Sequence, residues 1–218
     1  PVSTELAKFL TDPDLPPGSA VLLGSGDGAE PRVASTSTRF SSVVAVDHSQ
    51  LAMERIREMA QRLARHPEGE HITSVLGGVA AYKHPSGTAS AVVASHLLEY
   101  LDGPARESLL KAIAGWLKPG GRLYAAVHLA AGQRFEDLLQ YGNVAAAQGD
   151  GRGTVTISQL VPPRPDATQV QHFFTPDGIR QDLRRSGITA ANGFAVRVET
   201  LGTAAGFVEA IILVTKLK

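Results

Sequence analysis

The chain has 218 residues, and its 21 basic and 21 acidic side chains cancel to a formal charge of zero. This length suits a single domain with a sizeable core. The balanced charge gives no sign of a nucleic-acid backbone or an anionic membrane as partner. The absence of cysteine excludes disulfides, thiolate metal sites and a cysteine nucleophile. No signal-peptide pattern or membrane-spanning apolar run is present, so we expect a cytoplasmic protein.

Short apolar runs alternate with amphipathic segments through the first 128 residues. This alternation is typical of β-α repeats around a mainly parallel sheet. We predict strands at 20–23, 42–46, 71–76, 90–94 and 122–127. We predict helices at 29–40, 51–63 and 104–117, with Ser49 and Asp102 as caps and with Pro119, Gly120 and Gly121 ending the last one. The fold class is therefore α/β, a Rossmann-like mainly parallel sheet with helices on both faces.

The pattern changes after residue 128. A helix-like stretch, a "GDGRG" loop and two strands at 154–160 and 168–174 indicate an inserted substrate-side segment at 129–174. A helix near 176–187 and two long apolar runs then predict a terminal antiparallel strand pair. We expect one domain over 1–218, with an N-terminal helix or lid at 1–14.

Three glycines alternate in "VLLGSGDGAE", at Gly24, Gly26 and Gly28. A dinucleotide loop, a loop for a nucleoside-type ligand without phosphates, and a tight turn without a ligand all fit this spacing. Asp47 ends the second strand, where its carboxylate could accept hydrogen bonds from ribose hydroxyls or cap the next helix. The loop and Asp47 together favour a nucleoside-type ligand.

The stretches "LLGSGDG", "VVAVDHS", "SAVVASHLLEYL" and "WLKPGGRLYAAV", in this order and spacing, resemble the class I S-adenosylmethionine-dependent methyltransferases. The likeness covers roughly residues 15–128, and the end of the chain is similar to the family's last helix and terminal hairpin. This ending argues against a dinucleotide-binding Rossmann domain for NAD.

The resemblance implies S-adenosylmethionine as cofactor. The implied contacts are Gly24, Ser25 and Gly26 along the methionine portion, Asp47 on the ribose, His48 and the backbone of Val79 at adenine, and Ser95 with His96 at the methyl-transfer site. Three positions depart from the family pattern, because Leu22, Gly78 and Ser90 stand where acids are usual. Loss of two polar contacts would weaken cofactor binding. A protein that keeps the fold without methyl transfer is therefore the alternative.

His96 and His128 are the candidate catalytic residues, because each falls at the carboxyl end of a parallel strand. An imidazole there could take a proton from a hydroxyl acceptor, and a hydrogen-bonded structural histidine is the alternative. Glu99 is expected at the surface. His172 borders the insertion and could line a substrate entrance. His66, His71 and His84 lack metal-site spacing, and we predict no metal. 

The function predicted from the sequence is S-adenosylmethionine-dependent methyl transfer to a small molecule, at oxygen or nitrogen. The alternative is an isomerase- or cyclase-type catalyst or a binding module on the same fold. A nucleic-acid methyltransferase would need a basic patch and an N-P-P-Y-like tetrapeptide, where this chain has "SHLL". We expect no nucleic-acid or membrane partner, and a homodimer is left open.

Overall fold

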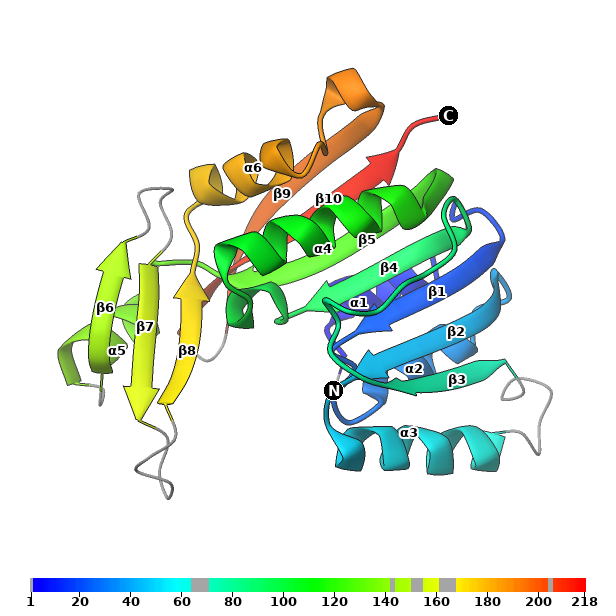
Figure 1. Ribbon diagram of the computed structural model, residues 1–218, viewed down its shortest axis with the longest axis horizontal. Helices are drawn as coiled ribbons and strands as arrows, with labels where there is room; N and C mark the ends of the chain where they lie inside the picture. The colour runs from blue at the N-terminus through cyan, green and yellow to red at the C-terminus, as the bar shows by residue number, and fades with distance from the viewer. Residues whose placement is uncertain (1, 64–70, 142–143, 150–154, 161–167, 204–205) are drawn as a thin grey trace.

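The computed structural model describes residues 2–63, 71–141, 144–149, 155–160, 168–203 and 206–218. Seven strands form one sheet in the order β3-β2-β1-β4-β5-β10-β9 (Figure 1). They are β1 (Gly18–Leu23), β2 (Phe40–Asp47), β3 (Ile72–Leu76), β4 (Ala89–Ser95), β5 (Leu117–His128), β9 (Phe194–Gly202) and β10 (Val208–Lys216). Neighbours from β3 to β5 are parallel, and β10 is antiparallel to both β5 and β9. The predicted mainly parallel sheet with an antiparallel pair is confirmed.

Helices cover both faces of this sheet (Figure 1). They are α1 (Thr4–Leu10), α2 (Ala29–Ser35), α3 (Gln50–Leu63), α4 (Gly103–Trp116) and α6 (Pro176–Arg185), with short 3-10 turns η1 (Leu98–Tyr100) and η2 (Ala190–Asn192). A further helix, α5 (Gln133–Tyr141), lies beside the small sheet of the insertion (Figure 1). Side chains alternate across each strand, so Val21 and Leu23 pack on the α4 and α6 side while Ala20 and Leu22 pack on the α1 and α2 side. Both faces are therefore buried, which explains the continuous apolar runs.

The predicted caps are confirmed. The hydroxyl of Ser49 accepts a hydrogen bond from the backbone N–H of Ala52 (3.3 Å), and Asp102 accepts one from Ala105 (2.8 Å). Helix α2 ends at Ser35, earlier than predicted, because the Ser- and Thr-rich end of the segment has poor helix propensity.

The "KPGG" turn was predicted to end helix α4, and it lies instead inside β5 as an irregularity of the ladder. Leu117 pairs with Ala89 and Arg122 pairs with Ala91, so the extra residues bulge between these pairs. A Cβ atom on Gly121 would lie 2.6 Å from the carbonyl oxygen of Ala89, so glycine is required there.

The insertion contains α5 and a separate three-stranded sheet, β6 (Val144–Gly149), β7 (Val155–Leu160) and β8 (Thr168–Phe173). Strand β6 was not predicted, because three of its six residues are alanines, which have low β propensity, and only Val144 is β-branched. The "GDGRG" loop falls mostly outside the described residues. Figure 1 shows the small sheet beyond the carboxyl ends of the parallel strands.

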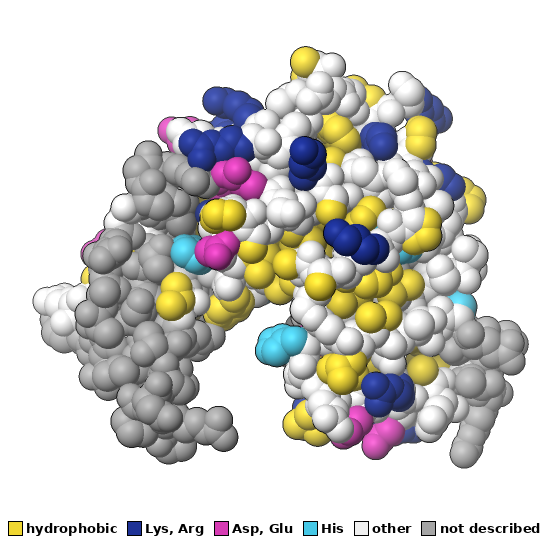
Figure 2. Space-filling model, in the orientation of Figure 1, with side chains coloured by type: hydrophobic (Ala, Val, Ile, Leu, Met, Phe, Trp, Pro, Cys, Tyr) yellow, Lys and Arg dark blue, Asp and Glu magenta, His cyan; other side chains and the backbone are white. Residues whose placement is uncertain are grey.

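On the face shown in Figure 2, Lys and Arg side chains are scattered among apolar and uncharged surface. No helix in the described part of the chain has the length and apolar character needed to cross a bilayer.

An almost fully buried ion pair joins α4 to α6. The Nε atom of Arg106 lies 2.7 Å from Oδ2 of Asp182, and the two side chains are 1% and 4% exposed. Another guanidinium nitrogen of Arg106 donates to the carbonyl of Leu101 (2.8 Å), and the group lies over the ring of Phe174. The pair therefore fixes α6, which follows the insertion, against η1 and α4.

Replacing Asp182 by Ala should lower the free energy of unfolding by about 3–5 kcal/mol, because it leaves the charge of Arg106 buried without its partner. The control Arg62→Ala removes an exposed ion pair with Glu58 in α3 and should change it by less than about 0.5 kcal/mol. Urea unfolding followed by circular dichroism measures both. Equal losses would contradict this role of the buried pair.

Candidate active site

The parallel strands place the predicted site residues along one edge of the sheet. Gly24 directly follows β1, Asp47 ends β2, Ser95 ends β4 and His128 ends β5. Parallel strands share their carboxyl edge, so these four residues lie on the same side of the molecule. Figure 1 shows this edge directed toward the small sheet of the insertion.

The glycine loop after β1 has left-handed backbone at all three glycines. The φ angles are +69° at Gly24, +49° at Gly26 and +84° at Gly28. The N–H of Gly24 donates to the carbonyl of Val46 (2.8 Å), and the hydroxyl of Ser25 donates to the carbonyl of Leu22 (2.8 Å). The loop is thus held by the chain itself, and its conformation requires glycine.

Asp47 is buried and supports this loop. Its Oδ2 atom accepts a hydrogen bond from the N–H of Gly26 (3.0 Å), and Oδ1 accepts one from Ser49 (2.8 Å). Asp47 therefore supports the glycine loop and the turn before α3, whose cap is Ser49. A carboxylate offers about four acceptor positions, so this one can still receive hydroxyl donors.

Open space borders Asp47 at the end of β3. A Cβ atom on Gly77 or Gly78 would meet nothing within 4 Å, and the N–H of Gly77 donates to the carbonyl of Asp47. His48 extends outward with 89% of its side chain exposed, and Val79 is buried. The loop, the carboxylate and this open edge fit a nucleoside-type cofactor, with His48 and Val79 at the predicted adenine end.

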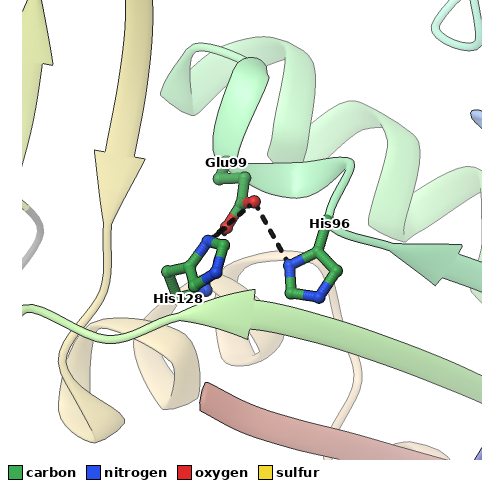
Figure 3. A group of neighbouring side chains, drawn as sticks. All are labelled: His96, Glu99 and His128. Carbon is green, nitrogen blue, oxygen red and sulfur yellow. Dashed lines mark hydrogen bonds and ion pairs between the residues drawn. The ribbon is translucent and has the colours of Figure 1, made fainter. Parts of the chain in front are cut away.

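A buried carboxylate joins the two candidate catalytic histidines (Figure 3). Glu99 is completely buried, and its Oε2 atom accepts a hydrogen bond from the backbone N–H of His128 (2.9 Å). Nδ1 of His128 lies 3.1 Å from both carboxylate oxygens, and Nδ1 of His96 lies 3.3 Å from Oε1. The expectation that Glu99 lies at the surface is wrong, because η1 turns it inward beneath both imidazoles.

The environment of Glu99 keeps it ionised. Burial alone would raise its pKa, but the contacts from His128 and His96 outweigh burial and lower the pKa to about 2. An anionic Glu99 can accept a hydrogen bond from Nδ1–H of His128, and the tautomer that donates this bond carries its lone pair on Nε2. Nδ1 of His96 lies at ion-pair distance from the same carboxylate.

His96 has a strained backbone. Its φ angle is +48°, and no other non-glycine residue in the described ranges has a positive φ. Such a conformation costs on the order of 1–3 kcal/mol and is typical of functional sites. It sets the ring of His96 against that of His128, with centroids 4.6 Å apart. Burial lowers the pKa of His96, but Glu99, Glu209 and Glu30 raise it overall.

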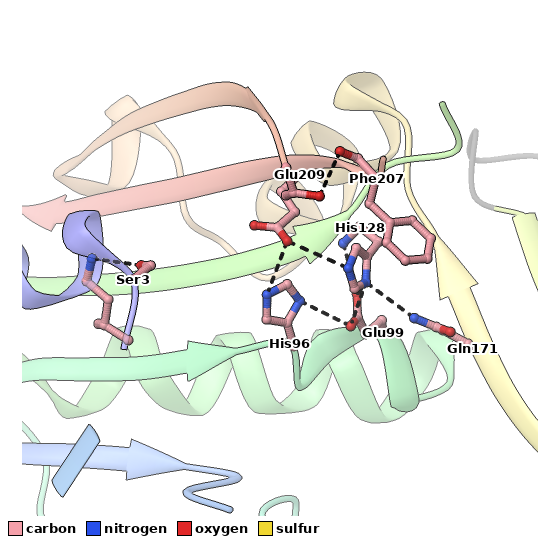
Figure 4. A network of polar contacts seen from close by, with 9 residues as sticks. Ser3, His96, Glu99, His128, Gln171, Phe207 and Glu209 are labelled. Carbon is pink, nitrogen blue, oxygen red and sulfur yellow. Dashed lines mark hydrogen bonds and ion pairs between the residues drawn. The ribbon is translucent and has the colours of Figure 1, made fainter. Parts of the chain in front are cut away.

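A second carboxylate faces the other side of the imidazole pair (Figure 4). Glu209 on β10 pairs across the ladder with His128. Its Oε1 atom lies 3.6 Å from Nε2 of His96 and 3.7 Å from Nε2 of His128. Sequence reasoning missed this residue, although a lone acid within the apolar run "FVEAIILV" was a usable signal.

Glu30 in α2 was also missed. Burial raises its pKa to about 7, an effect that His96 opposes and Asp27 adds to. Its Oε2 atom is buried and has no hydrogen-bond partner in the described structure. The acid directly after "GDGA", at the start of a helix, was the available signal.

Two further side chains, those of Gln171 and Phe207, lie beside the imidazole of His128. The amide of Gln171 lies 3.3 Å from Nδ1 of His128, and the ring of Phe207 lies 4.5 Å from the imidazole. His172, next to Gln171 on β8, is half-buried. Tyr100 is 46% exposed.

The prediction that the protein binds no metal was based on the spacing of His66, His71 and His84. His84 contacts Ser19 and Thr88 at the opposite edge of the sheet, and His66 lies outside the described residues. The structure instead brings ligand atoms of His96, Glu99 and His128 within 4.8 Å of one another.

Comparisons with known proteins agree with this geometry. Residues 21–121 match the family model of a methyltransferase domain. No sequence among the curated proteins matches this chain.

Three solved structures are similar over almost the whole chain. A 1,6-didemethyltoxoflavin N1-methyltransferase of Burkholderia thailandensis, with 1,6-didemethyltoxoflavin and S-adenosylhomocysteine bound, has 16% identity and a TM-score of 0.68 over 99% of this chain and 78% of that one. An S-adenosylmethionine-dependent methyltransferase of Methanosarcina mazei has 19% identity and a TM-score of 0.65, with 99% and 98% covered. Magnesium protoporphyrin IX methyltransferase of Synechocystis PCC 6803 has 16% identity and a TM-score of 0.65, with 98% and 80% covered. At these identities the likeness shows the fold.

Two glycines with nearly equal backbone angles test how tightly the cofactor loop is packed. Gly24 and Gly87 have φ angles of +69° and +68°, but a Cβ atom on Gly24 would lie 3.1 Å from Leu97, whereas one on Gly87 would meet nothing within 4 Å. Both alanine variants should lose about 1–2 kcal/mol of unfolding free energy to the left-handed backbone. Gly24→Ala should lose more, measured by chemical denaturation. Equal losses would show that Leu97 does not close on the loop.

Proposed function

We propose that the protein uses S-adenosylmethionine to methylate a small molecule at an oxygen or nitrogen atom. The match of residues 21–121 to a methyltransferase-domain model supports this proposal. The observation that carries this proposal is the imidazole pair on Glu99, at the same sheet edge as the glycine loop and Asp47. Donor and acceptor would meet where these two groups of residues face one another.

The cofactor supplies an activated methyl group, so the protein has to align the acceptor and remove its proton. Gly24, Ser25 and Gly26 would hold the methionine portion, Asp47 the ribose, and Ser95 would border the transferred methyl group. Nε2 of His128 would receive the acceptor's proton, while Glu99 holds its other nitrogen. His96 stacks beside it as the alternative base.

A small acceptor is supported by the surroundings of the site. The Lys and Arg side chains visible in Figure 2 form no patch that would bind a phosphate backbone. The insertion lies beyond the carboxyl ends of the parallel strands (Figure 1), and its residue Gln171 lies 3.3 Å from Nδ1 of His128, so it would take part in binding the acceptor. The Burkholderia methyltransferase with a similar fold was crystallised with a small-molecule substrate.

The departures from the family pattern favour a second candidate, a protein of this fold that binds a ligand without methyl transfer. Leu22 is fully buried in the core beneath the loop, so no acid is available there. Gly78 likewise offers no side chain at the end of β3. The second candidate predicts no methyl transfer to any hydroxyl or amine acceptor.

S-adenosylhomocysteine should raise the melting temperature of the purified protein in a concentration-dependent way, because a ligand that binds only the folded state stabilises it. NAD should produce no shift, since the strand beside β5 is the antiparallel β10, whereas a dinucleotide-binding sheet continues with parallel strands. Differential scanning fluorimetry measures both. The absence of a shift at millimolar S-adenosylhomocysteine would contradict the assignment of the glycine loop.

Asp47→Ala should weaken binding of S-adenosylhomocysteine by roughly 1–3 kcal/mol, the range for hydrogen bonds to a charged group. Calorimetric titration measures this, with the exposed Asp14→Ala as a control of equal charge change. An unchanged dissociation constant in folded Asp47→Ala protein would show that Asp47 only supports the glycine loop and does not bind the ribose.

His128→Ala should reduce turnover about a hundred- to ten-thousandfold with a hydroxyl acceptor, the usual contribution of a positioned base. Cofactor affinity should stay nearly constant. His84→Asn, at the opposite sheet edge, is the matched control. Near-normal turnover of folded His128→Ala would move the role to His96.

A further inference from the structure

The side chains of His96, His128 and Glu209 face one another at the candidate active-site edge, at separations longer than hydrogen bonds. The oxygen of Glu209 lies 3.6 and 3.7 Å from the Nε2 atoms of His96 and His128. These separations are too long for hydrogen bonds. They are close to the distance of about 3.4 Å that separates two ligands at 2.1 Å from one tetrahedral ion.

The Nδ1 atoms of both imidazoles, on the opposite side of each ring, face the carboxylate of Glu99. Nδ1 of His128 and Nδ1 of His96 lie 3.1 and 3.3 Å from the buried carboxylate of Glu99. A carboxylate that holds Nδ1–H directs the lone pair of Nε2 outward, and metal-bound histidines in proteins are usually held in this way. Glu99 is therefore placed to orient both imidazoles, through a hydrogen bond with Nδ1 of His128 and an ion-pair contact with Nδ1 of His96.

The local charge also favours a cation. Two carboxylates contact both imidazoles, the fully buried Glu99 and the 20% exposed Glu209. Among the described residues, neither carboxylate forms an ion pair with a Lys or Arg side chain. A divalent ion would balance these two acidic groups.

We propose that His96, His128 and Glu209 bind one divalent transition-metal ion of the zinc type, with Glu99 holding the two histidines in position. Two imidazoles and one carboxylate are a known ligand set of zinc sites that keep one position open. Mg²⁺ prefers oxygen ligands and fits this set poorly.

The fourth position on the ion, which no protein ligand occupies, would bind the methyl acceptor; this step rests on the proposed function. An acceptor hydroxyl bound to the ion loses its proton to solvent more readily, because the ion lowers its pKa. The oxygen–carbon bond then forms as the sulfur–carbon bond of the donor breaks. In the ion-bound protein His128 acts as a ligand, and the acceptors belong to the class of small hydroxyl compounds.

The test uses the full chain, stripped with a chelator and then dialysed against Zn²⁺ or Mg²⁺, with bound metal measured by mass spectrometry. We expect one Zn²⁺ per chain and no stoichiometric Mg²⁺. Glu209→Gln and His128→Asn should each weaken Zn²⁺ binding by more than about tenfold, and Glu99→Gln by about ten- to a hundredfold. Glu199→Gln is the matched control, because Glu199 is a partly exposed carboxylate on the adjacent strand paired with Arg197. It should bind as wild type does.

Co²⁺ provides a readout that needs no variant. The unmodified protein should give the strong visible absorption of a four-coordinate Co²⁺ ion, and the weak spectrum of a hydrated six-coordinate ion would overturn the proposal. Failure of the wild type to retain Zn²⁺, or Zn²⁺ binding by folded Glu209→Gln as tight as wild type, would overturn it as well. S-adenosylhomocysteine binding is measured on the same samples. A protein that binds S-adenosylhomocysteine without Zn²⁺ loses only this inference, whereas one that binds Zn²⁺ without S-adenosylhomocysteine loses the proposed function.

Discussion

The carboxylate of Glu99 is the group on which the active-site edge depends. A fully buried charge is tolerated only when hydrogen bonds replace the water it has lost. Here the backbone N–H and Nδ1 of His128 provide those hydrogen bonds, and Nδ1 of His96 adds an ion-pair contact at 3.3 Å. Since these partners come from the ends of β4 and β5, the carboxylate also joins two strand ends that no turn connects. The orientation of both imidazoles follows from this one requirement.

The sheet topology places the residues of the candidate site at one edge, and local contacts then orient their side chains. Parallel strands bring the glycine loop, Asp47, Ser95 and His128 to one edge because their carboxyl ends coincide. Glu209 reaches the same edge by the opposite route, near the start of an antiparallel strand. A donor site and an imidazole site built on neighbouring strand ends need no loop of their own to hold them in register, and the insertion can differ in shape without disturbing them.

Patterns local to the sequence predicted the fold and the position of the proposed cofactor-binding residues at one edge of the sheet. Apolar runs and caps depend on neighbours within a few residues, so the strands and the helices begun by Ser49 and Asp102 were recognisable, as was Asp47 at a strand end. The burial of Glu99 was not, because a charged residue in a short turn is usually exposed and only the end of β5 makes it otherwise. The strained backbone of His96 and the approach of Glu209 likewise depend on contacts between distant segments. The turn after Trp116 was misplaced because proline and glycine mark both a helix end and a bulge.

Strand β10 lies between β5 and β9 in the sheet, yet it follows every other strand along the chain. During synthesis the segments that carry Glu99, His96 and His128 emerge first, and the central gap next to β5 stays open until β10 has left the ribosome. Up to that point the edge of β5 is unpaired and the imidazoles lack the carboxylate on their second side. The nascent protein can therefore assemble the glycine loop and the Asp47 end of β2 early, whereas the imidazole pair gains Glu209 only when β10 joins the sheet. A chain interrupted before β10 would lack this carboxylate and would expose the edge of β5.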